Sequence, residues 1–274
     1  MSAATVIAVA SGKGGVGKTN VAVNLAVALT RLRRRVAIVD ADFGLGNVDV
    51  LLGLRPDAHI GHVLTGEREL SDVMIAGPGG IQILPASSGL RDLTWLSPAQ
   101  RARLVRAFTT LREAVDFVLI DTATGISENV IQTLRLAQRI MLVTSTDPAA
   151  IVDAYATAKV ISMTVTGREV GVVVNSVTSG EDAMMTFRQL DMAATKFLDQ
   201  TLSYYGFVPH DSTVQRAVAT QRAVVEMAPQ APASRALRVL ASRLAGMGPV
   251  TDSGLRIVKD AAQHAAAPEV PRCA

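Results

Sequence analysis

Short aliphatic runs recur along the chain and are separated by longer stretches with helical spacing. The runs are continuous rather than alternately apolar and polar, which is typical of strands buried on both faces of a parallel sheet. The predicted strands are Thr5–Ala10, Val36–Asp40, Ile81–Pro85, Phe117–Thr122, Ile140–Thr144, Val170–Asn175 and Tyr204–Pro209. Most of them end at a polar residue, Gly or Pro, where binding loops leave a parallel sheet.

Helical patterns fill the gaps between these strands. Between Lys18 and Leu32, apolar residues recur every three or four positions, which predicts a half-buried helix. The other predicted helices are Pro98–Ala114, Ser127–Ala137, Ala149–Thr164, Glu181–Gln200 and Ser234–Leu244. This alternation predicts an α/β domain over residues 1–246, with a doubly wound, mostly parallel sheet flanked by helices. For the Ala-rich residues 247–274 we expect a flexible tail or a weak amphipathic helix.

Composition narrows the class of protein. The chain is 49% apolar and 4% aromatic, and its 27 basic and 24 acidic residues leave a charge of +3, too small to indicate nucleic-acid binding by itself. The only cysteine, Cys273, excludes a disulfide framework and an iron–sulfur site within one chain. The apolar start has no basic segment before it, and no apolar run approaches the ~18 residues of a spanning helix. We expect a cytoplasmic protein.

The segment GKGGVGKT fits the phosphate-loop pattern G-x-x-x-x-G-K-[ST]. A predicted strand precedes it and a predicted helix follows it, which is the context that this pattern requires. The residues predicted to surround the phosphates of ATP are Gly12, Lys13, Gly14, Gly15, Val16, Gly17, Lys18 and Thr19. Lys18 is predicted to reach the β- and γ-phosphates, and the Thr19 hydroxyl is predicted to bind Mg²⁺.

Carboxylates follow two other predicted strands. Asp121 ends a buried strand, the expected position for a Mg²⁺ ligand. Asp40 is either a capping or a turn residue, whereas Asp42 lies in the next loop, where it is predicted to orient the attacking water and to contribute to the metal site. Asp49 either takes part in this site or caps a short helix. Because no glutamate follows Asp121 as a strong base, we expect slow hydrolysis.

Together these motifs resemble the MinD/ParA family of P-loop ATPases (SIMIBI-like P-loop NTPases with a deviant Walker A motif), from the start of the chain to about Gly246. By this resemblance Lys13 is the signature lysine, which crosses a dimer interface to the phosphates of ATP in the other subunit. The resemblance implies a homodimer with ATP and catalytic roles for Lys13, Lys18 and Asp42. It also implies that Asn175 and the turn Pro209–Asp211 contact adenine and ribose, although Asn175 at a strand end is equally compatible with a plain turn.

Four further segments are similar to the flagellar-number regulators of FlhG/FleN type. They are DADFGLGNVDVLLGL (Asp40–Leu54), PASSG (Pro85–Gly89), VDAYATAKV (Val152–Val160) and YGFVPHDSTVQRAVATQRAV (Tyr205–Val224). This similarity implies a protein partner, either a flagellar transcription activator or a flagellar GTPase. The first strand begins a few residues after Met1, without the N-terminal helix that stimulates the GTPase, so we favour the activator. The segment DTATGIS departs from the family at Thr124, where the family usually has Ala. The amphipathic pattern of residues 247–274 is weak, so the sequence leaves open whether the protein contacts the inner face of the membrane.

Other classes compete with this interpretation. A ParA-type ATPase that partitions DNA or protein cargo competes with it, and binding to DNA needs a basic surface. The densest basic run is RLRRR (Arg31–Arg35). It lies at the end of a predicted helix, where basic residues interact favourably with the helix dipole, so DNA binding is not needed to explain it. Relatives that carry iron–sulfur clusters need cysteine pairs, which this sequence lacks. A ligase or kinase needs a second substrate pocket, for which the sequence gives no candidate. The histidines are scattered and form no metal-ligand pattern.

Overall fold

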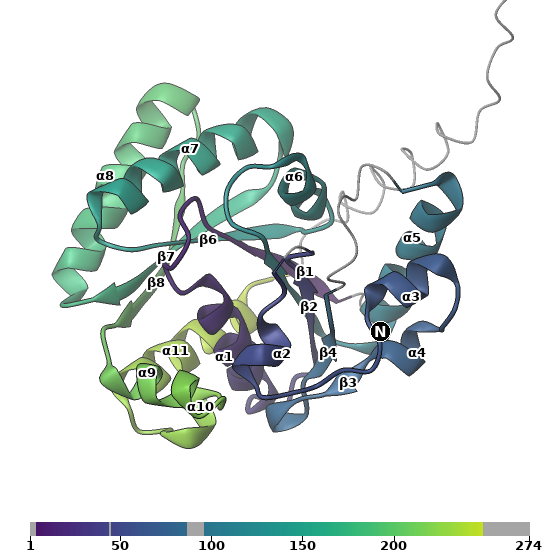
Figure 1. The fold of residues 1–274 in the computed structure, drawn as a ribbon. Coiled ribbons are helices and arrows are strands. Elements are labelled where there is room, and N and C mark those ends of the chain that lie inside the picture. The colour runs from purple at the N-terminus through teal and green to yellow at the C-terminus, as the bar shows by residue number, and fades with distance from the viewer. Residues whose placement is uncertain (1–3, 44, 87–95, 249–274) are drawn as a thin grey trace, which may run out of the picture.

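The computed structural model describes residues 4–43, 45–86 and 96–248. Its strands form one sheet in the order β3-β4-β2-β5-β1-β6-β7-β8, with every neighbouring pair parallel except β3 and β4 (Figure 1). The strands are β1 Thr5–Ala10, β2 Val36–Ala41, β3 Ile75–Ala76, β4 Gln82–Leu84, β5 Phe117–Thr122, β6 Arg139–Thr144, β7 Glu169–Val177 and β8 Ser203–Pro209. The predicted mostly parallel sheet is therefore confirmed.

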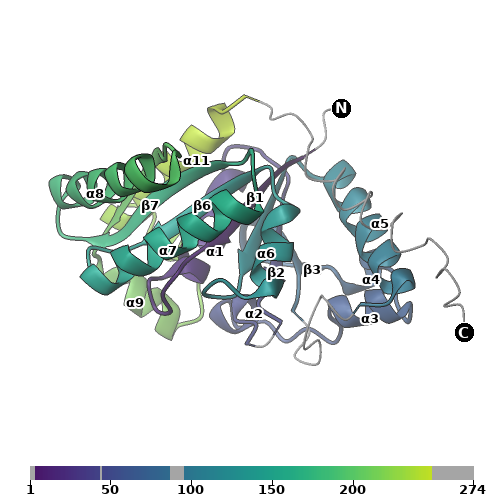
Figure 2. The ribbon, with the colours of Figure 1, turned by 90° about the horizontal axis from the view of Figure 1, so that it is seen from above.

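Helices cover both faces of the sheet (Figure 2). They are α1 Lys18–Thr30, α2 Val48–Leu51, α3 Ile60–Thr65, α4 Leu70–Val73, the 3₁₀ turn η1 Pro78–Gly80, α5 Pro98–Ala114, α6 Glu128–Arg135, α7 Pro148–Thr164, α8 Gly180–Leu198, α9 Ser212–Ala219, α10 Val224–Met227 and α11 Pro232–Gly246. In β1 the side chains alternate between two cores: Val6 and Ala8 pack with α5 to α8, whereas Ile7 and Val9 pack with α1, α10 and α11. A continuous aliphatic strand thus contributes apolar side chains to the core on each face of the sheet.

Helix α1 differs from its prediction. A half-buried helix was expected, but every side chain from Val21 to Leu29 is buried. The outer face of α1 is covered by α10 and α11, from the far end of the chain, and it includes the fully buried Asn24. The Asn24 side chain accepts a hydrogen bond from the Val225 backbone N–H of α10 at 3.2 Å and donates one to the Asn20 carbonyl at 2.9 Å. The polar residue therefore joins two helices.

The largest omissions of the sequence analysis lie between the second and third predicted strands and after the last one. There α2, α3, α4, β3 and η1 follow one another, and α9 and α10 precede α11. Each has at most eight residues, too few for a clear helical repeat. The bounds of the predicted helices and strands move by a few residues, as with Val170–Asn175, which extends to β7 Glu169–Val177.

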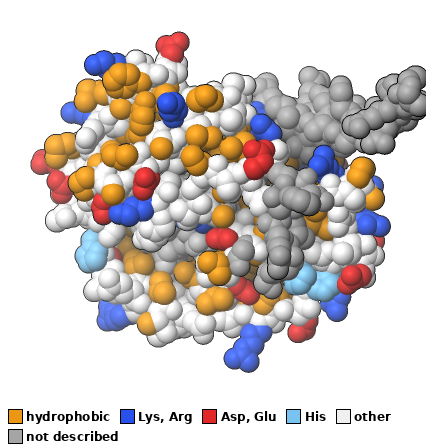
Figure 3. All heavy atoms as spheres, turned by 45° about the horizontal axis from the view of Figure 1, so that its top comes forward, with side chains coloured by type: hydrophobic (Ala, Val, Ile, Leu, Met, Phe, Trp, Pro, Cys, Tyr) orange, Lys and Arg blue, Asp and Glu red, His pale blue; other side chains and the backbone are white. Residues whose placement is uncertain are grey.

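The chain's outer surface bears exposed apolar side chains over α7 and α8, where Figure 3 shows them gathered. They are Val152 and Met163 on α7 and Met185, Met192 and Phe197 on α8. Among the described residues, no helix has the length and apolar character needed to cross a bilayer. Helix α11 ends at Gly246, where the predicted domain also ends. The tail from residue 249 on, with Cys273 and His264, and PASSG from residue 87 lie outside the described residues.

Candidate nucleotide-binding site

The phosphate loop joins the centre of the sheet to a buried helix. Strand β1 lies between β5 and β6, where the strand order reverses, and the loop after Ala10 leads into α1 at Lys18. Gly17 has φ +88°, and a Cβ there would overlap the side-chain amide of Asn175. Gly15 has φ +81° but faces open space. The backbone conformation explains glycine at both positions, and the contact with Asn175 adds a second reason at Gly17.

A cavity of about 480 Å³ opens over this loop. It is lined by Ser11, Gly15, Val16, Gly17, Lys18, Thr19, Asn20, Asp42, Asn47, Val50, Leu51, Thr124, Val218 and Gln221. The Ser11 hydroxyl is buried and has no hydrogen-bond partner in the part of the chain that the structure describes. Gly17, the N-cap of α1, has no side chain to satisfy the first-turn N–H groups. Unpaired donors at a helix N-terminus beside a lysine fit a polyphosphate.

Lys18 contacts Asp121 at the buried end of the loop. Its ammonium lies 2.7 Å from Oδ1 of Asp121, and the two side chains are 7% and 1% exposed. Burial raises the pKa of Asp121, and the Lys18 charge opposes this increase. The predicted phosphate lysine and the predicted metal carboxylate thus neutralise each other. Thr19, another of the three predicted Mg²⁺ ligands, has its hydroxyl 3.5 Å from the Lys18 ammonium.

Asp40 is a turn residue that shapes the following loop, one of the alternatives expected for it. Its buried carboxylate accepts hydrogen bonds from the N–H groups of Asp42 (3.1 Å), Asn47 (2.9 Å) and Val48 (3.0 Å). Burial raises the pKa of Asp40 to about 7, although the bonds from Val48 and Asp42 oppose the increase. Through these bonds Asp40 holds Asp42 and Asn47 at the phosphate cavity. Asp49 lies in the first turn of α2, outside that lining.

Lys13 lies at the exposed end of the loop and outside the lining of the phosphate cavity. Its ammonium is 3.0 Å from Oδ2 of Asp147, with the two side chains 37% and 51% exposed. Oδ1 of Asp147 accepts the N–H groups of Ala149 (2.7 Å) and Ala150 (3.3 Å) and so caps α7. The bond from Lys13, followed by those from the two N–H groups, lowers the pKa of Asp147. The two lysines of the loop therefore point to different surroundings.

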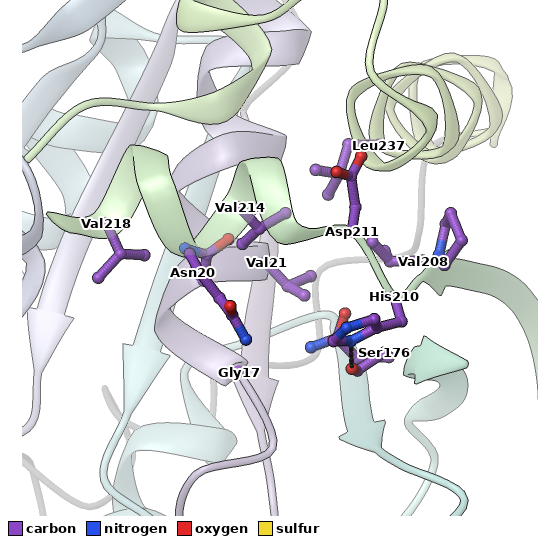
Figure 4. A pocket seen from close by; sticks show the side chains of 13 residues that line it. Gly17, Asn20, Val21, Ser176, Val208, His210, Asp211, Val214, Val218 and Leu237 are labelled. Carbon is purple, nitrogen blue, oxygen red and sulfur yellow. Dashed lines mark hydrogen bonds between the residues drawn. The ribbon is translucent and has the colours of Figure 1, made fainter. Parts of the chain in front are cut away.

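A second pocket, of about 350 Å³, lies beside the N-terminal end of α1 (Figure 4). Val21, Val208, Val214, Val218 and Leu237 give it an apolar lining. Ser176 and His210 stand at one end, with the Ser176 hydroxyl 3.1 Å from Nδ1 of the imidazole. Gly17, Asn20 and Val218 line both cavities, so the two adjoin. The flat base of a nucleotide fits this apolar pocket, with the phosphates of the same nucleotide over the loop.

The structure places the predicted base-contacting residues Asn175, Pro209 and Asp211 together in this pocket. Asn175 donates from its amide to the Val16 carbonyl at 2.7 Å, which leaves its side-chain oxygen as an acceptor. Asp211 also makes structural contacts. Its Oδ1 accepts the Thr213 N–H at 2.8 Å and caps α9, and its Oδ2 accepts the N–H of Ala233 at 3.1 Å. Asp211 thus joins α9 to α11.

Sequence reasoning missed several lining residues. Asn20, Val214 and Gln221 were not predicted, and His210 was included only as part of the turn Pro209–Asp211. Asn20 follows the phosphate motif directly, so its place in the first turn of α1 was the one available signal. Gln221 lies after α9, has φ +53° and donates to the Val50 carbonyl at 2.8 Å, a contact across the cleft that no local pattern indicates.

The described residues contain no cluster of three or more His, Cys, Asp or Glu side chains arranged to hold a metal ion. Mg²⁺ that binds together with a nucleotide needs only one or two protein oxygens besides phosphate and water. Thr19 and Asp42 line the phosphate cavity, and Asp121 lies beside them through Lys18. The donor set fits Mg²⁺ bound with a nucleotide and does not fit a dedicated metal centre.

Comparison with known proteins identifies the family. Residues 2–245 match the ParA family, described as NUBPL iron-transfer P-loop NTPase. The chain belongs to the ParA family of P-loop NTPases. A ParA-family relative, the antiactivator FleN of Pseudomonas aeruginosa, is 44% identical over 239 residues, which cover 87% of this chain and 85% of FleN. The flagellum site-determining protein YlxH of Helicobacter pylori is 30% identical over 239 residues, or 87% and 81% of the two chains.

Solved ParA-family structures share the fold. The septum site-determining protein MinD of Pyrococcus horikoshii, complexed with Mg-ADP, has a TM-score of 0.73 and 25% identity, over 89% of this chain and 98% of MinD. These matches confirm the predicted resemblance to the MinD/ParA family and to FlhG/FleN-type proteins, and the chain is a P-loop ATPase. Its single cysteine, Cys273, provides no cysteine set of the kind that iron–sulfur ligation uses.

Proposed function

We propose that this ATPase is a molecular switch that dimerises with ATP and hydrolyses it slowly to regulate flagellar number. The observation that carries this proposal is the separation of the two loop lysines. Lys18 lines the phosphate cavity, whereas Lys13 lies outside it and is partly exposed. A partly exposed lysine outside its own phosphate cavity is available for the phosphates of a second subunit.

Within one subunit, Lys18 and the N–H groups of the loop would bind the β- and γ-phosphates. Thr19, Asp42 and Asp121 would hold Mg²⁺, which neutralises charge on the phosphate oxygens when bound. Binding requires Lys18 to turn from Asp121 toward the phosphates, which frees the Asp121 carboxylate for the metal site. Asp42 would also orient the attacking water, and Lys13 of the second subunit would stabilise the charge that develops in the transition state.

Two loops would report the γ-phosphate to the surface. Asp40 holds the first loop in shape by its three N–H bonds, and Asp42 and Asn47 of that loop reach the phosphate cavity. The second loop carries Thr124, which lines the same cavity, and the Gly125 N–H donates to the Ser11 carbonyl at 2.9 Å. Contacts made only with the γ-phosphate would therefore change both loops together.

In the pocket beside α1, the base would lie between the valines and His210, and the free oxygen of Asn175 would accept from the amino group of adenine. The output would be binding of a flagellar transcription activator. The sequence identity of this chain with the antiactivator FleN and with the flagellum site-determining protein YlxH supports a flagellar role. The exposed apolar side chains of α7 and α8 favour a protein partner, because contiguous apolar surface is typical of protein-binding sites.

The test measures binding of the purified protein to the flagellar transcription activator of the source organism, with ATP·Mg²⁺ and with ADP. We expect binding with ATP that Lys13→Ala abolishes. A duplex DNA of mixed sequence is the parallel sample, at low and at physiological salt. Binding to DNA with ATP that falls steeply with salt, together with no binding to the activator, would replace this proposal by a ParA-type partitioning role.

A further inference from the structure

The loop between β5 and α6 carries a hydroxyl at the phosphate cavity to which the proposed function assigns no contact. We infer that the Thr124 hydroxyl donates a hydrogen bond to the γ-phosphate of ATP and thereby makes the site prefer ATP to ADP. The inference rests on the position that the proposed function gives to the phosphates, because Thr124 lines that cavity. It requires neither the dimer nor the partner protein.

The place of Thr124 in the cleft points to the last phosphate. Gly17, Asn20 and Val218 line both the base pocket and the phosphate cavity, so a nucleotide passes from one to the other beside them. Thr124 lines the phosphate cavity alone, as Asp42 does. The γ-phosphate is the part of ATP farthest from the base. A side chain of the phosphate cavity that is absent from the base pocket is therefore placed for the terminal phosphate.

The backbone around Thr124 is fixed to the central strand and to the phosphate loop. Before it, the buried Thr122 hydroxyl donates to the Val9 carbonyl of β1 at 3.1 Å. After it, the Gly125 N–H donates to the Ser11 carbonyl at the start of the phosphate loop at 2.9 Å. Anchors on both sides hold Thr124 against the loop that binds the phosphates. A group held in this way loses little freedom when it binds a ligand.

The Thr124 hydroxyl is available for a ligand. The side chain is exposed, and no hydrogen bond of its hydroxyl occurs within residues 4–43, 45–86 and 96–248. Thr122, two residues earlier, instead uses its hydroxyl inside the fold. The buried Ser11 hydroxyl also lines the phosphate cavity and likewise lacks a partner in the described part of the chain. A terminal phosphate would bring the acceptor oxygens that such donors lack.

A contact with the γ-phosphate alone separates ATP from ADP. With ADP the exposed hydroxyl stays bonded to water, so it adds nothing to the affinity. With ATP it donates to a charged oxygen, and loss of such a hydrogen bond weakens binding by about ten-fold or more. The whole effect of the hydroxyl therefore falls on ATP.

Thr124→Val separates the hydroxyl from the shape of the side chain. Valine is β-branched like threonine, so the restriction of the side chain and the conformation of the loop are kept. Thr124→Ser keeps the hydroxyl and loses only the methyl group. Ser127→Ala is the matched control, because Ser127 lies three residues later, makes no cap hydrogen bond with its side chain and is absent from the cavity lining.

Calorimetric titration measures the affinity of each variant for ADP and for the β,γ-imido analogue of ATP, both with Mg²⁺. All variants are made in a Lys13→Ala parent, which by the proposed function stays monomeric, so that the affinities report one subunit. We expect Thr124→Val to weaken binding of the analogue by about ten-fold and to leave ADP binding within about two-fold. Thr124→Ser and Ser127→Ala should keep both affinities within about three-fold of the parent.

Several results would overturn the inference. They are an unchanged affinity of Thr124→Val for the analogue, an equal loss for both nucleotides, and a loss in Thr124→Ser as large as in Thr124→Val. Slower turnover of Thr124→Val in the otherwise wild-type chain, with unchanged affinity for the analogue, would assign the hydroxyl to the attacking water and would also overturn it. A wild-type protein that stays monomeric with ATP would contradict the proposed function alone, whereas one that binds neither nucleotide would contradict both.

Phosphorus NMR of the bound analogue locates the contact directly. Between the Lys13→Ala parent and its Thr124→Val variant, the γ-phosphorus resonance should shift, and the α and β resonances should stay in place. A shift confined to the α or β resonance would put Thr124 beside another phosphate and would contradict the inference.

Discussion

The buried and the exposed ends of the phosphate loop use the same chemistry with opposite consequences. At the buried end Lys18 pairs with Asp121, and burial raises the pKa of that carboxyl; at the exposed end Lys13 pairs with Asp147, and the bond lowers the pKa. Removing a partner from a buried pair leaves an uncompensated charge, whereas an exposed charge returns to water. The comparison teaches that loss of the cation costs stability at the buried pair, whereas the exposed pair contributes little to stability.

Lys18→Met should have the largest effect on stability. It leaves the Asp121 carboxylate buried without a cation, which costs about 3–5 kcal/mol of unfolding free energy at neutral pH. The loss should diminish as pH falls, because protonation removes the buried charge. Urea unfolding measures both, with Lys13→Met as the matched control, which should unfold close to wild type. Equal losses in the two variants would remove the distinction between the ends of the loop.

Asp40 is a second buried carboxyl near the loop, and its contribution to stability depends on pH. Its folded pKa of about 7 lies above the unfolded value of about 4, so the folded state binds more protons between these values. Stability contributed by this group is therefore fully present below about pH 4 and is lost as pH rises toward about 7, by at most about 4 kcal/mol. Urea unfolding across this range should show the decline, and Asp40→Asn should flatten it. A wild-type stability that rises over this range, once the other carboxyls are allowed for, would contradict the raised pKa.

Two glycines of the loop sharpen the comparison further. Gly17→Ala adds a methyl group that collides with Asn175 at φ +88°, whereas Gly15→Ala adds one to open space at φ +81°. The left-handed backbone costs about 1 kcal/mol in both variants, and the collision adds to it at Gly17 alone. We expect Gly17→Ala to lose at least about 1 kcal/mol more unfolding free energy than Gly15→Ala in urea unfolding. Similar losses in the two would show that Asn175 moves aside easily.

Much of the fold and of the phosphate site could be predicted because their signals are local. The strands are continuous aliphatic runs, and the phosphate loop is a contiguous motif between a strand and a helix. What failed depends on segments distant in sequence. The burial of α1 comes from α10 and α11, which cover it from the other end of the chain, and no pattern within Lys18–Leu32 reports that.

Contacts at the base pocket and at the exposed end of the loop also join residues that are distant in sequence. Asp211 lines the pocket, and its second oxygen accepts the N–H of Ala233, 22 residues later, which no local pattern indicates. Lys13 and Asp147 are 134 residues apart, and each looks alone like a solvated side chain. The short helix α9, which lines the base pocket, and the short helix α10 carry too little periodicity to be recognised.

Light scattering coupled to size exclusion tests the central claim most directly. Wild type, Lys13→Ala and Asp42→Ala are compared with ATP·Mg²⁺ and with ADP, and bound nucleotide is quantified in each peak. The account predicts a dimer with ATP only, retained longer in Asp42→Ala because hydrolysis is impaired, and absent in Lys13→Ala although ATP is bound. A wild-type monomer with ATP bound under every condition would contradict the action of Lys13 across subunits.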